Sequence, residues 1–242
     1  MNPPECDIRR AFLVVVLQSG KVVRIGNLSV PVGQAAAEMQ GAFRRSLATR
    51  STGTLLEIGS RSRSGVTRRD MTPAGWTYVG LDVMAGPNVD IVGDAHELSS
   101  IFAANSFDAV MSFSVLEHLL MPWRFVVELN RILKVGAIGL FTTHQTWPVH
   151  DAPWDFWRFS DKAWAGLLNP ATGYKIHSAN MGEPAFVVAQ RCHAITNFGT
   201  EQHGYLSSNV IFEKTAETKL DWPVSLQDVL TSAYPPGEIS LS

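Results

Sequence analysis

Apolar residues recur along the chain with two different spacings. Between residues 54 and 144, short apolar runs alternate with stretches of helical spacing. In Arg124–Leu133 the apolar residues fall on one helical face, and Lys134 and Gly136 follow as stop signals. Strands that alternate with helices predict a parallel sheet built from βαβ units. The runs that we expect to form buried strands are residues 54–60, 76–82, 88–94, 107–113 and 137–144.

The N-terminal region has a different pattern. Its apolar run Ala11–Leu17 is shorter than the about 20 residues that span a bilayer, and no small-residue cleavage site follows it. The run is rich in valine and is followed by Ser19 and Gly20, which predicts a strand and a hairpin turn. Val32–Leu47 then predicts a helix.

The C-terminal region carries weaker signals. Asn209–Thr215 predicts a late antiparallel strand, a short helix is expected to begin at Pro223, and residues 234–242 are expected to be a loose tail. The length suits a single domain. We expect that domain to span residues 1–242, as an N-terminal extension (1–50), a cofactor-binding core (54–180), and C-terminal strands and tail (181–242).

Composition narrows the class of protein. The chain has 242 residues, of which 45% are hydrophobic and 17% charged, as in ordinary globular proteins. Its net charge of -2 provides no positive field for a nucleic-acid backbone. Cys6 and Cys192 form neither a disulfide framework nor a metal-binding motif, so a reducing cytoplasm is expected. Seven arginines between Arg44 and Arg69 form either a solvated face or a site for an anionic ligand.

Candidate chemistry is found where the predicted strands end, because open α/β sheets bind ligands outside the carboxyl ends of their strands. A glycine lets the backbone approach a ligand closely, and an acid can accept both hydroxyls of a ribose. Gly59 and Gly65 do not form the GxGxxG pattern of dinucleotide-binding proteins. The residues at these ends are Glu57, Gly59, Ser60 and Arg61, then Asp82, then Asp94 and Ala95, then Ser112 to His118, and last His144.

The order of these strand-end residues along the chain resembles that in class I S-adenosylmethionine-dependent methyltransferases with a type 11 methyltransferase domain. The motifs are LLEIGSR, VGLDV, GDAHEL, FDAVMSFSVLEHL and ELNRILKVGA, and the resemblance spans roughly residues 54–180. It implies a Rossmann-like, doubly wound, mostly parallel sheet of seven strands, here with an N-terminal hairpin and helix added. It also implies S-adenosylmethionine as the cofactor.

The resemblance further implies a role for each cofactor-binding position. Arg61 and Arg63 stand where the commoner pattern has glycines, which leaves the path of that loop open. The implied contacts are Glu57 and Gly59 at the methionine end, Asp82 on the ribose hydroxyls, Val83 against the adenine, Asp94 on the adenine amino group with Ala95 beside it, Ser112 through its backbone, and His118 near the sulfonium. Ser60 and Arg61 are also expected to bind the cofactor.

The segment Thr142–Ser160 suggests the acceptor. Methyl transfer to a hydroxyl needs a base near neutral pH, which suits histidine. His144 ends the fifth predicted strand and is our candidate base, with His118 and His150 behind it. The alternative is that His144 has only a structural role.

The same segment offers candidate substrate-binding residues. The carboxylates of Asp151 and Asp155 suit a polyol or the orientation of a histidine, and Arg158 is able to pair with one of them. The indoles of Trp154, Trp157 and their neighbour Trp147 suit either a sugar ring or ordinary core packing. The segment resembles the acceptor loop of methyltransferases from glycan and polysaccharide pathways.

We therefore expect an enzyme that methylates a hydroxyl of a sugar or oligosaccharide, with no nucleic-acid or membrane partner. A nucleotide or other small-molecule acceptor, and a cofactor-binding protein without catalysis, remain as alternatives. Magnesium is compatible with Asp94, Asp151 and Asp155, but no spacing requires it. The N-terminal extension either caps the active site or forms a homodimer interface.

Overall fold

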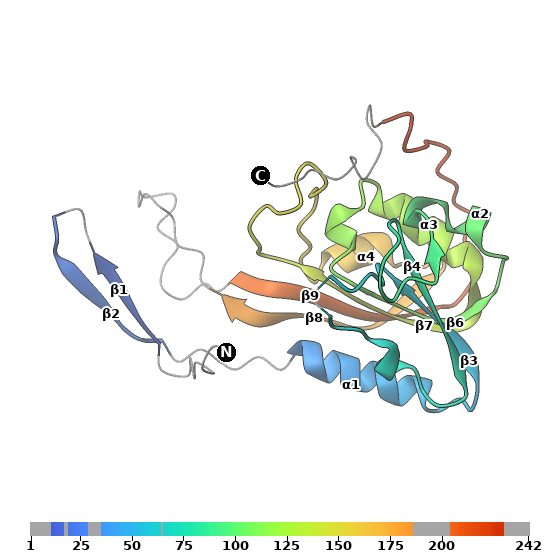
Figure 1. The fold of residues 1–242 in the computed structure, drawn as a ribbon, viewed down its shortest axis with the longest axis horizontal. Coiled ribbons are helices and arrows are strands. Elements are labelled where there is room, and N and C mark those ends of the chain that lie inside the picture. The colour runs from blue at the N-terminus through green and yellow to red at the C-terminus, as the bar shows by residue number, and fades with distance from the viewer. Residues whose placement is uncertain (1–10, 17–18, 29–34, 64, 186–203, 230–242) are drawn as a thin grey trace.

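The computed structural model describes residues 11–16, 19–28, 35–63, 65–185 and 204–229. Both cysteines, the expected helix start at Val32 and the tail from residue 234 lie outside these ranges. Two sheets are present (Figure 1). The smaller is the predicted hairpin, in which β1 (Ala11–Val16) pairs antiparallel with β2 (Val22–Leu28).

The larger sheet has seven strands in the order β5-β4-β3-β6-β7-β9-β8. The first five strands of this order are parallel, and β9 and β8 are added antiparallel at one edge. The predicted seven-stranded, mostly parallel, doubly wound sheet is therefore confirmed. The strands are β3 (Gly53–Ile58), β4 (Trp76–Asp82), β5 (Ile91–Val92), β6 (Phe107–Phe113), β7 (Leu133–His144), β8 (Tyr174–Ala185) and β9 (Gly204–Lys214).

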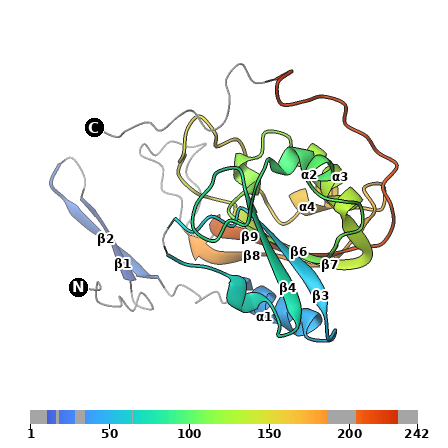
Figure 2. The ribbon, with the colours of Figure 1, turned by 45° about the vertical axis from the view of Figure 1, so that its right-hand side comes forward.

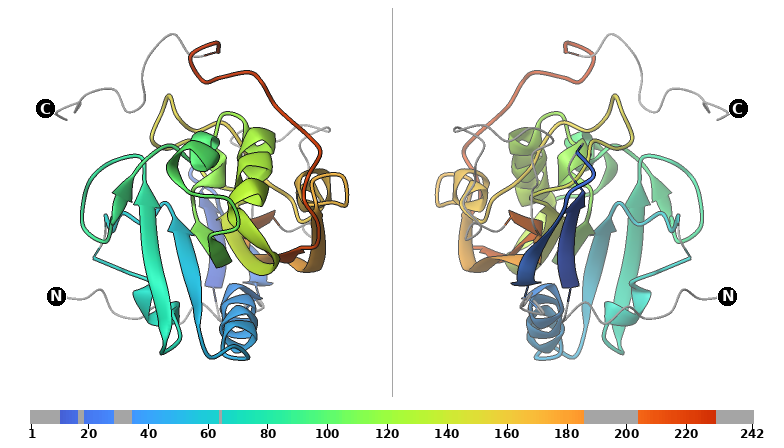
Figure 3. Two further views of the ribbon diagram at one scale, coloured as in Figure 1. Left: turned by 90° about the vertical axis from the view of Figure 1, so that its right-hand side faces the viewer. Right: turned by 90° about the vertical axis from the view of Figure 1, so that its left-hand side faces the viewer.

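Helices cover both faces of the larger sheet (Figures 2 and 3). The helix α1 (Ala35–Leu47) lies on one face and buries Met39, Phe43 and Leu47 there. On the other face lie α2 (Leu98–Ile101), α3 (Pro122–Ile132) and α4 (Ala163–Leu167). Short 3-10 turns at η2 (Arg69–Met71), η3 (Ala95–Glu97) and η4 (Leu116–His118) connect these elements.

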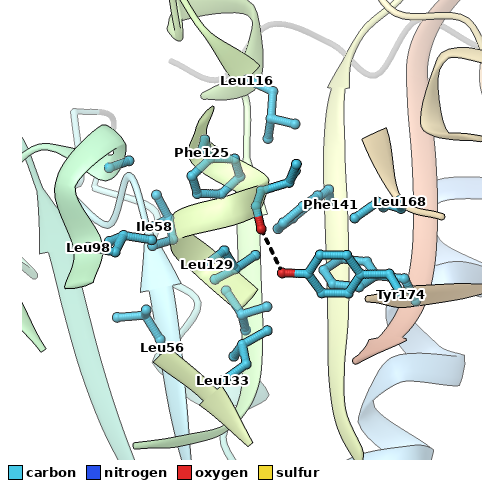
Figure 4. Packing of buried hydrophobic residues seen from close by; sticks show 14 of the residues in the cluster. Leu56, Ile58, Leu98, Leu116, Phe125, Leu129, Leu133, Phe141, Leu168 and Tyr174 are labelled. Atoms are coloured by element: carbon cyan, nitrogen blue, oxygen red, sulfur yellow. Dashed lines mark hydrogen bonds between the residues drawn. The ribbon is translucent and has the colours of Figure 1, made fainter. Parts of the chain in front are cut away.

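The main core lies between the sheet and α3. Strand β6 is central and buried on both faces, which explains why its sequence is almost continuously apolar. Phe125 and Leu129 of α3 pack in the same cluster as Phe141 of β7 (Figure 4). The hydroxyl of buried Tyr174 donates to the carbonyl of Val126 at 2.9 Å, so a polar group that is costly to bury is satisfied.

The structure corrects the element predictions in three places. Strand β5 has only two residues, because the chain before it turns at Asn88, which has a φ of 72°. Strand β8 was not predicted, since it is an edge strand with several exposed positions and weak apolar alternation. The segment after Pro223 forms a turn closed by Ser225 and Asp228 in place of the expected helix.

Candidate functional site

A cavity of about 740 Å³ opens at the carboxyl ends of the parallel strands. Its walls come from the ends of β3, β4, β6 and β7 and from the loop after β7 (yellow in Figure 1). This volume is within the usual range for small-molecule sites. The predicted site residues that line it are Gly59, Arg61, Asp82, Val83, Asp94, Ala95, His118, His144, His150, Asp151 and Trp154.

Gly59 directly follows β3 and lines the side of the cavity where the cofactor is expected. Its φ is +77°, in the left-handed region that favours glycine, and an added Cβ would lie 2.1 Å from Val115 Cγ2. The sharp turn allows the amides of Gly59 and Ser60 to donate to the carbonyl of Leu81 at 2.8 and 3.0 Å. The glycine therefore brings the end of β3 close to the end of β4.

We expect Gly59→Ala to lower the free energy of unfolding by about 2 kcal/mol or more, since it combines a strained φ with a steric clash. Denaturant titration measures this change. Gly166→Ala is the matched control, because Gly166 lies in α4 and a Cβ added there would have nothing within 4 Å. Equal stability of the two variants would show that the turn at Gly59 tolerates a side chain.

Asp82 ends β4 and faces the cavity. Its carboxylate accepts from the amides of Arg61 at 3.1 Å and Met84 at 2.9 Å. The Arg61 guanidinium Nε lies 3.7 Å from the same carboxylate and is buried without a hydrogen-bond partner in the described structure. Two loops thus converge on one carboxylate at the position expected to bind a ribose.

Asp94 caps the turn η3. Its carboxylate accepts from the amide of His96 at 2.8 Å and contacts the His96 imidazole Nδ1 at 2.7 Å. Burial raises the pKa of Asp94, but the contacts with His96 outweigh it and the net pKa lies below the usual value. Asp94 is therefore held as an anion beside Ala95 at the cavity wall.

Six predicted site residues do not line the cavity: Glu57, Ser60, Ser112, Asp155, Trp157 and Arg158. Glu57 is buried and accepts from the hydroxyl of Tyr78 and, at 3.4 Å, from Asn88. Burial raises the pKa of Glu57 against the effect of these partners. The side chains of Ser60 and Ser112 are buried as well. Sequence position at a strand end did not reveal which way these side chains point.

The loop after β7 is held by Asp155 and Arg158. The Arg158 guanidinium donates to both carboxylate oxygens of Asp155 at 2.5 and 2.7 Å, and also to the carbonyls of Trp147 and Pro148. Hydrogen bonds from Arg158 hold the pKa of Asp155 well below its usual range. The predicted pairing of Arg158 with an acid is confirmed, and this pair shapes the loop from outside the cavity.

The tryptophans of this loop occupy different environments. Trp154 is buried and lines the cavity, whereas Trp157 is partly exposed and donates from Nε1 to the carbonyl of Leu120 at 3.3 Å. Trp147 also lines the cavity, and its ring stacks on His144 with centroids 4.8 Å apart and planes at 13°. Trp147 and Trp154 are thus the indoles available to a ligand.

Glu117 lies close to three histidines, His118, His144 and His150. The sequence analysis did not select Glu117, although it adjoins His118. Glu117 is fully buried, and its Oε1 lies 3.2 Å from His144 Nε2 and 3.9 Å from His118 Nε2. Its other oxygen accepts from the hydroxyl of Thr143. Burial lowers the pKa of His144, while the Glu117 charge acts in the opposite direction. A histidine that is neutral at neutral pH can accept a proton.

The cavity is closed on one side by an ion pair between two loops. Arg63, from the loop after β3, donates to Asp151 at 2.7 Å. Arg68 also lines the cavity and lies over the ring of Phe113 at 4.1 Å. The three aspartates considered for magnesium are engaged separately, Asp94 by His96, Asp151 by Arg63 and Asp155 by Arg158.

Comparison with known proteins identifies a domain within this chain. Residues 56–141, from β3 to β7, match the family model described as a methyltransferase domain. No curated protein matches the chain in sequence.

Similar solved structures share the fold at low identity. A SAM-dependent methyltransferase from Archaeoglobus fulgidus is 13% identical with a TM-score of 0.51, over 74% of this chain and 95% of that one. The YcgJ protein from Bacillus subtilis is 15% identical with a TM-score of 0.53, over 75% and 99%. The 1,6-didemethyltoxoflavin-N1-methyltransferase from Burkholderia thailandensis, with bound S-adenosylhomocysteine, is 13% identical with a TM-score of 0.54, over 76% and 80%.

Residues 56–141 thus match a methyltransferase domain, and the fold of the chain is shared with S-adenosylmethionine-dependent methyltransferases. Neither likeness defines an acceptor atom or molecule. The cavity residues fit this cofactor, because Asp82 offers a charged acceptor for a ribose diol and the close backbone turn at Gly59 leaves room for the methionine end. Within the described ranges, no helix has the length and apolar character needed to cross a membrane.

Proposed function

We propose that this chain is an S-adenosylmethionine-dependent methyltransferase that transfers a methyl group to a hydroxyl of a sugar or oligosaccharide, and that His144 is the general base. One observation carries the proposal: His144 lines the same cavity as Asp82 and Asp94 and lies against the indole of Trp147. A proton acceptor, a cofactor-binding edge and an aromatic face therefore share one enclosed space. An aromatic face suits the apolar side of a sugar ring.

When bound, S-adenosylmethionine supplies a methyl group on a positively charged sulfur. That methyl group would pass to the acceptor oxygen with loss of the carbon–sulfur bond, and His144 would take the hydroxyl proton. The carboxylate of Glu117, 3.2 Å from His144 Nε2, stabilises the imidazolium that forms. The Glu117–His144 contact lacks hydrogen-bond geometry, so the Glu117 Oε1 has no donor in the described structure.

The acceptor class rests on the loop after β7. Trp147 and Trp154 provide flat apolar walls, and the carboxylate of Asp151 lies at the cavity edge for hydroxyl groups. The loop resembles that of the 1-O-methyltransferase of methylmannose polysaccharide synthesis. We therefore propose manno- and gluco-oligosaccharides as the first acceptors to test.

The test is to incubate the pure protein with labelled S-adenosylmethionine and short manno- and gluco-oligosaccharides, some of them partly methylated. The expected result is label in a saccharide. Cofactor binding without transfer to any saccharide would overturn the acceptor class. Tight binding without turnover on a wider panel of alcohols and amines would indicate a protein without catalysis.

We expect Glu117→Gln to lower kcat by about tenfold, because a neutral amide no longer stabilises the imidazolium of His144. The substitution keeps the shape of the side chain and an acceptor for Thr143. Steady-state kinetics measure the change, and S-adenosylhomocysteine binding and thermal unfolding serve as controls. A loss of cofactor affinity or stability with an unchanged kcat would show that Glu117 has only a structural role.

A nucleotide acceptor is the second candidate, because Arg61, Arg63 and Arg68 all line the cavity. Guanidinium groups suit phosphates. Methyl transfer to a nucleoside phosphate that weakens strongly with added salt would favour this acceptor. Salt-insensitive transfer to a neutral saccharide would exclude it.

A further inference from the structure

We propose that His118, His150 and Asp151 form a binding site for a divalent transition metal ion in this cavity. One ligand atom from each residue lies within 4.8 Å of the other two. His118 comes from the turn η4 after β6, while His150 and Asp151 come from the loop after β7. All three line the cavity, so an ion bound between them would face the acceptor.

Each of the two imidazoles directs its Nδ1 at a hydrogen-bond acceptor. His118 Nδ1 lies 2.6 Å from the carbonyl oxygen of Trp154, which only accepts hydrogen bonds. His150 Nδ1 lies 3.2 Å from the carbonyl of Pro148 and 3.2 Å from the Asp155 carboxylate. Nδ1 is therefore the donor nitrogen of both rings, and Nε2 is the nitrogen that can bind a metal ion. Metal-bound histidines are oriented in this way by a carbonyl or carboxylate on the other nitrogen.

The charges around the cluster favour a cation. The Asp151 carboxylate accepts from Arg63 at 2.7 Å, and the carboxylates of Glu117 and Asp155 lie 3.9 Å from His118 and 3.2 Å from His150. Arg63 is 65% exposed, and Asp151 keeps further lone pairs for a metal ion. Glu117 adds an independent signal, because its buried Oε1 has no hydrogen-bond partner in the described structure and lies 3.9 Å from His118 Nε2. A fully buried carboxylate oxygen that faces imidazole nitrogens is stabilised by a cation between or beside them.

The ligand set selects the class of metal. Two imidazoles and one carboxylate suit manganese, iron, cobalt, nickel or zinc, whereas magnesium prefers oxygen ligands. Three protein ligands leave coordination positions open toward the cavity. If the proposed function holds, these positions suit two neighbouring oxygens of the acceptor, as in a vicinal diol. The metal would then hold the hydroxyl beside His144, whose ring centroid is 5.3 Å from that of His150.

The test is to titrate the full chain with Co²⁺ in the absence of cofactor and acceptor, and to follow the visible absorption of the ion and the heat of binding. We expect one Co²⁺ per chain, with at least tenfold weaker binding in His118→Ala and in His150→Ala. Excess Mg²⁺ is expected not to displace the ion. His177→Ala is the matched control, because His177 pairs with Glu213 at 2.9 Å on β8 and β9 and does not line the cavity.

Circular dichroism checks that each variant folds, and Asp151→Asn replaces any that does not. The proposal is overturned if wild type binds no Co²⁺, or if folded His150→Ala and Asp151→Asn bind it as tightly as wild type. Because this experiment uses no acceptor, its outcome is separate from the sugar assay. Cobalt binding with no transfer to saccharides would retain the metal site and reject the acceptor class.

Discussion

Replacing His144 by alanine is expected to lower kcat by about 10²–10⁴-fold, the usual contribution of a general base. The imidazole is the group that we propose takes the acceptor proton, and its Nε2 lies beside buried Glu117. The Kd for S-adenosylhomocysteine is expected to stay within about twofold, since the proposed ribose contact, Asp82, lies on another strand. Single-turnover transfer and calorimetry measure the two quantities.

His177→Ala is the control for the loss of an imidazole, because His177 is an exposed member of an ion pair on β8. It is expected to leave both kcat and cofactor affinity unchanged. If His144→Ala retains kcat, the proton goes elsewhere and the base assignment is wrong. If His144→Ala loses both kcat and cofactor binding, the result would show that His144 maintains the shape of the cavity.

Replacing Asp82 by alanine is expected to raise the Kd for S-adenosylmethionine by about 10–100-fold. A hydrogen bond to a charged acceptor contributes about 1.5–3 kcal/mol, and the carboxylate faces the cavity at the end of β4. Asp82 also accepts from the amides of Arg61 and Met84, so the alanine variant loosens both loops. Asp82→Asn keeps the size and one acceptor oxygen and is expected to show a smaller loss.

Asp90→Asn is the matched control. Asp90 accepts from the amide of Gly80 and from Arg69, and it does not line the cavity. Calorimetric titration with S-adenosylmethionine measures all three variants. An unchanged Kd in folded Asp82→Ala would place the ribose elsewhere in the cavity.

Much of the cofactor side was predictable from sequence. Strands β4 and β6 have the predicted bounds, and the residues that follow β3, β4 and β5 meet at one cavity. This succeeded because buried parallel strands have a local apolar signature, and a parallel sheet brings all carboxyl ends to one edge. The same reasoning did not show that the side chains of Glu57 and Ser112 are buried away from the cavity, because a strand alternates its side chains between two faces.

The acceptor side was predictable only in part. The sequence indicated His144, His150 and Trp154, all of which line the cavity. It also indicated Asp155 and Arg158, which instead bond to each other and hold the loop. A loop has no regular repeat that predicts the direction of each side chain. The composition therefore identified the segment, but not which of its residues line the cavity.

The sequence by itself determined the class of fold, the edge of the sheet at which the cavity lies, and the segment after β7 that lines it. Each of these depends on apolar periodicity or on residues close together in the chain. Only the tertiary structure decided that Glu117 lies beneath His144 and that Arg63 reaches Asp151. Such contacts join residues that are far apart in sequence, and their distances are set by the packing of β6 against β7 and by the return of the loop over the cavity.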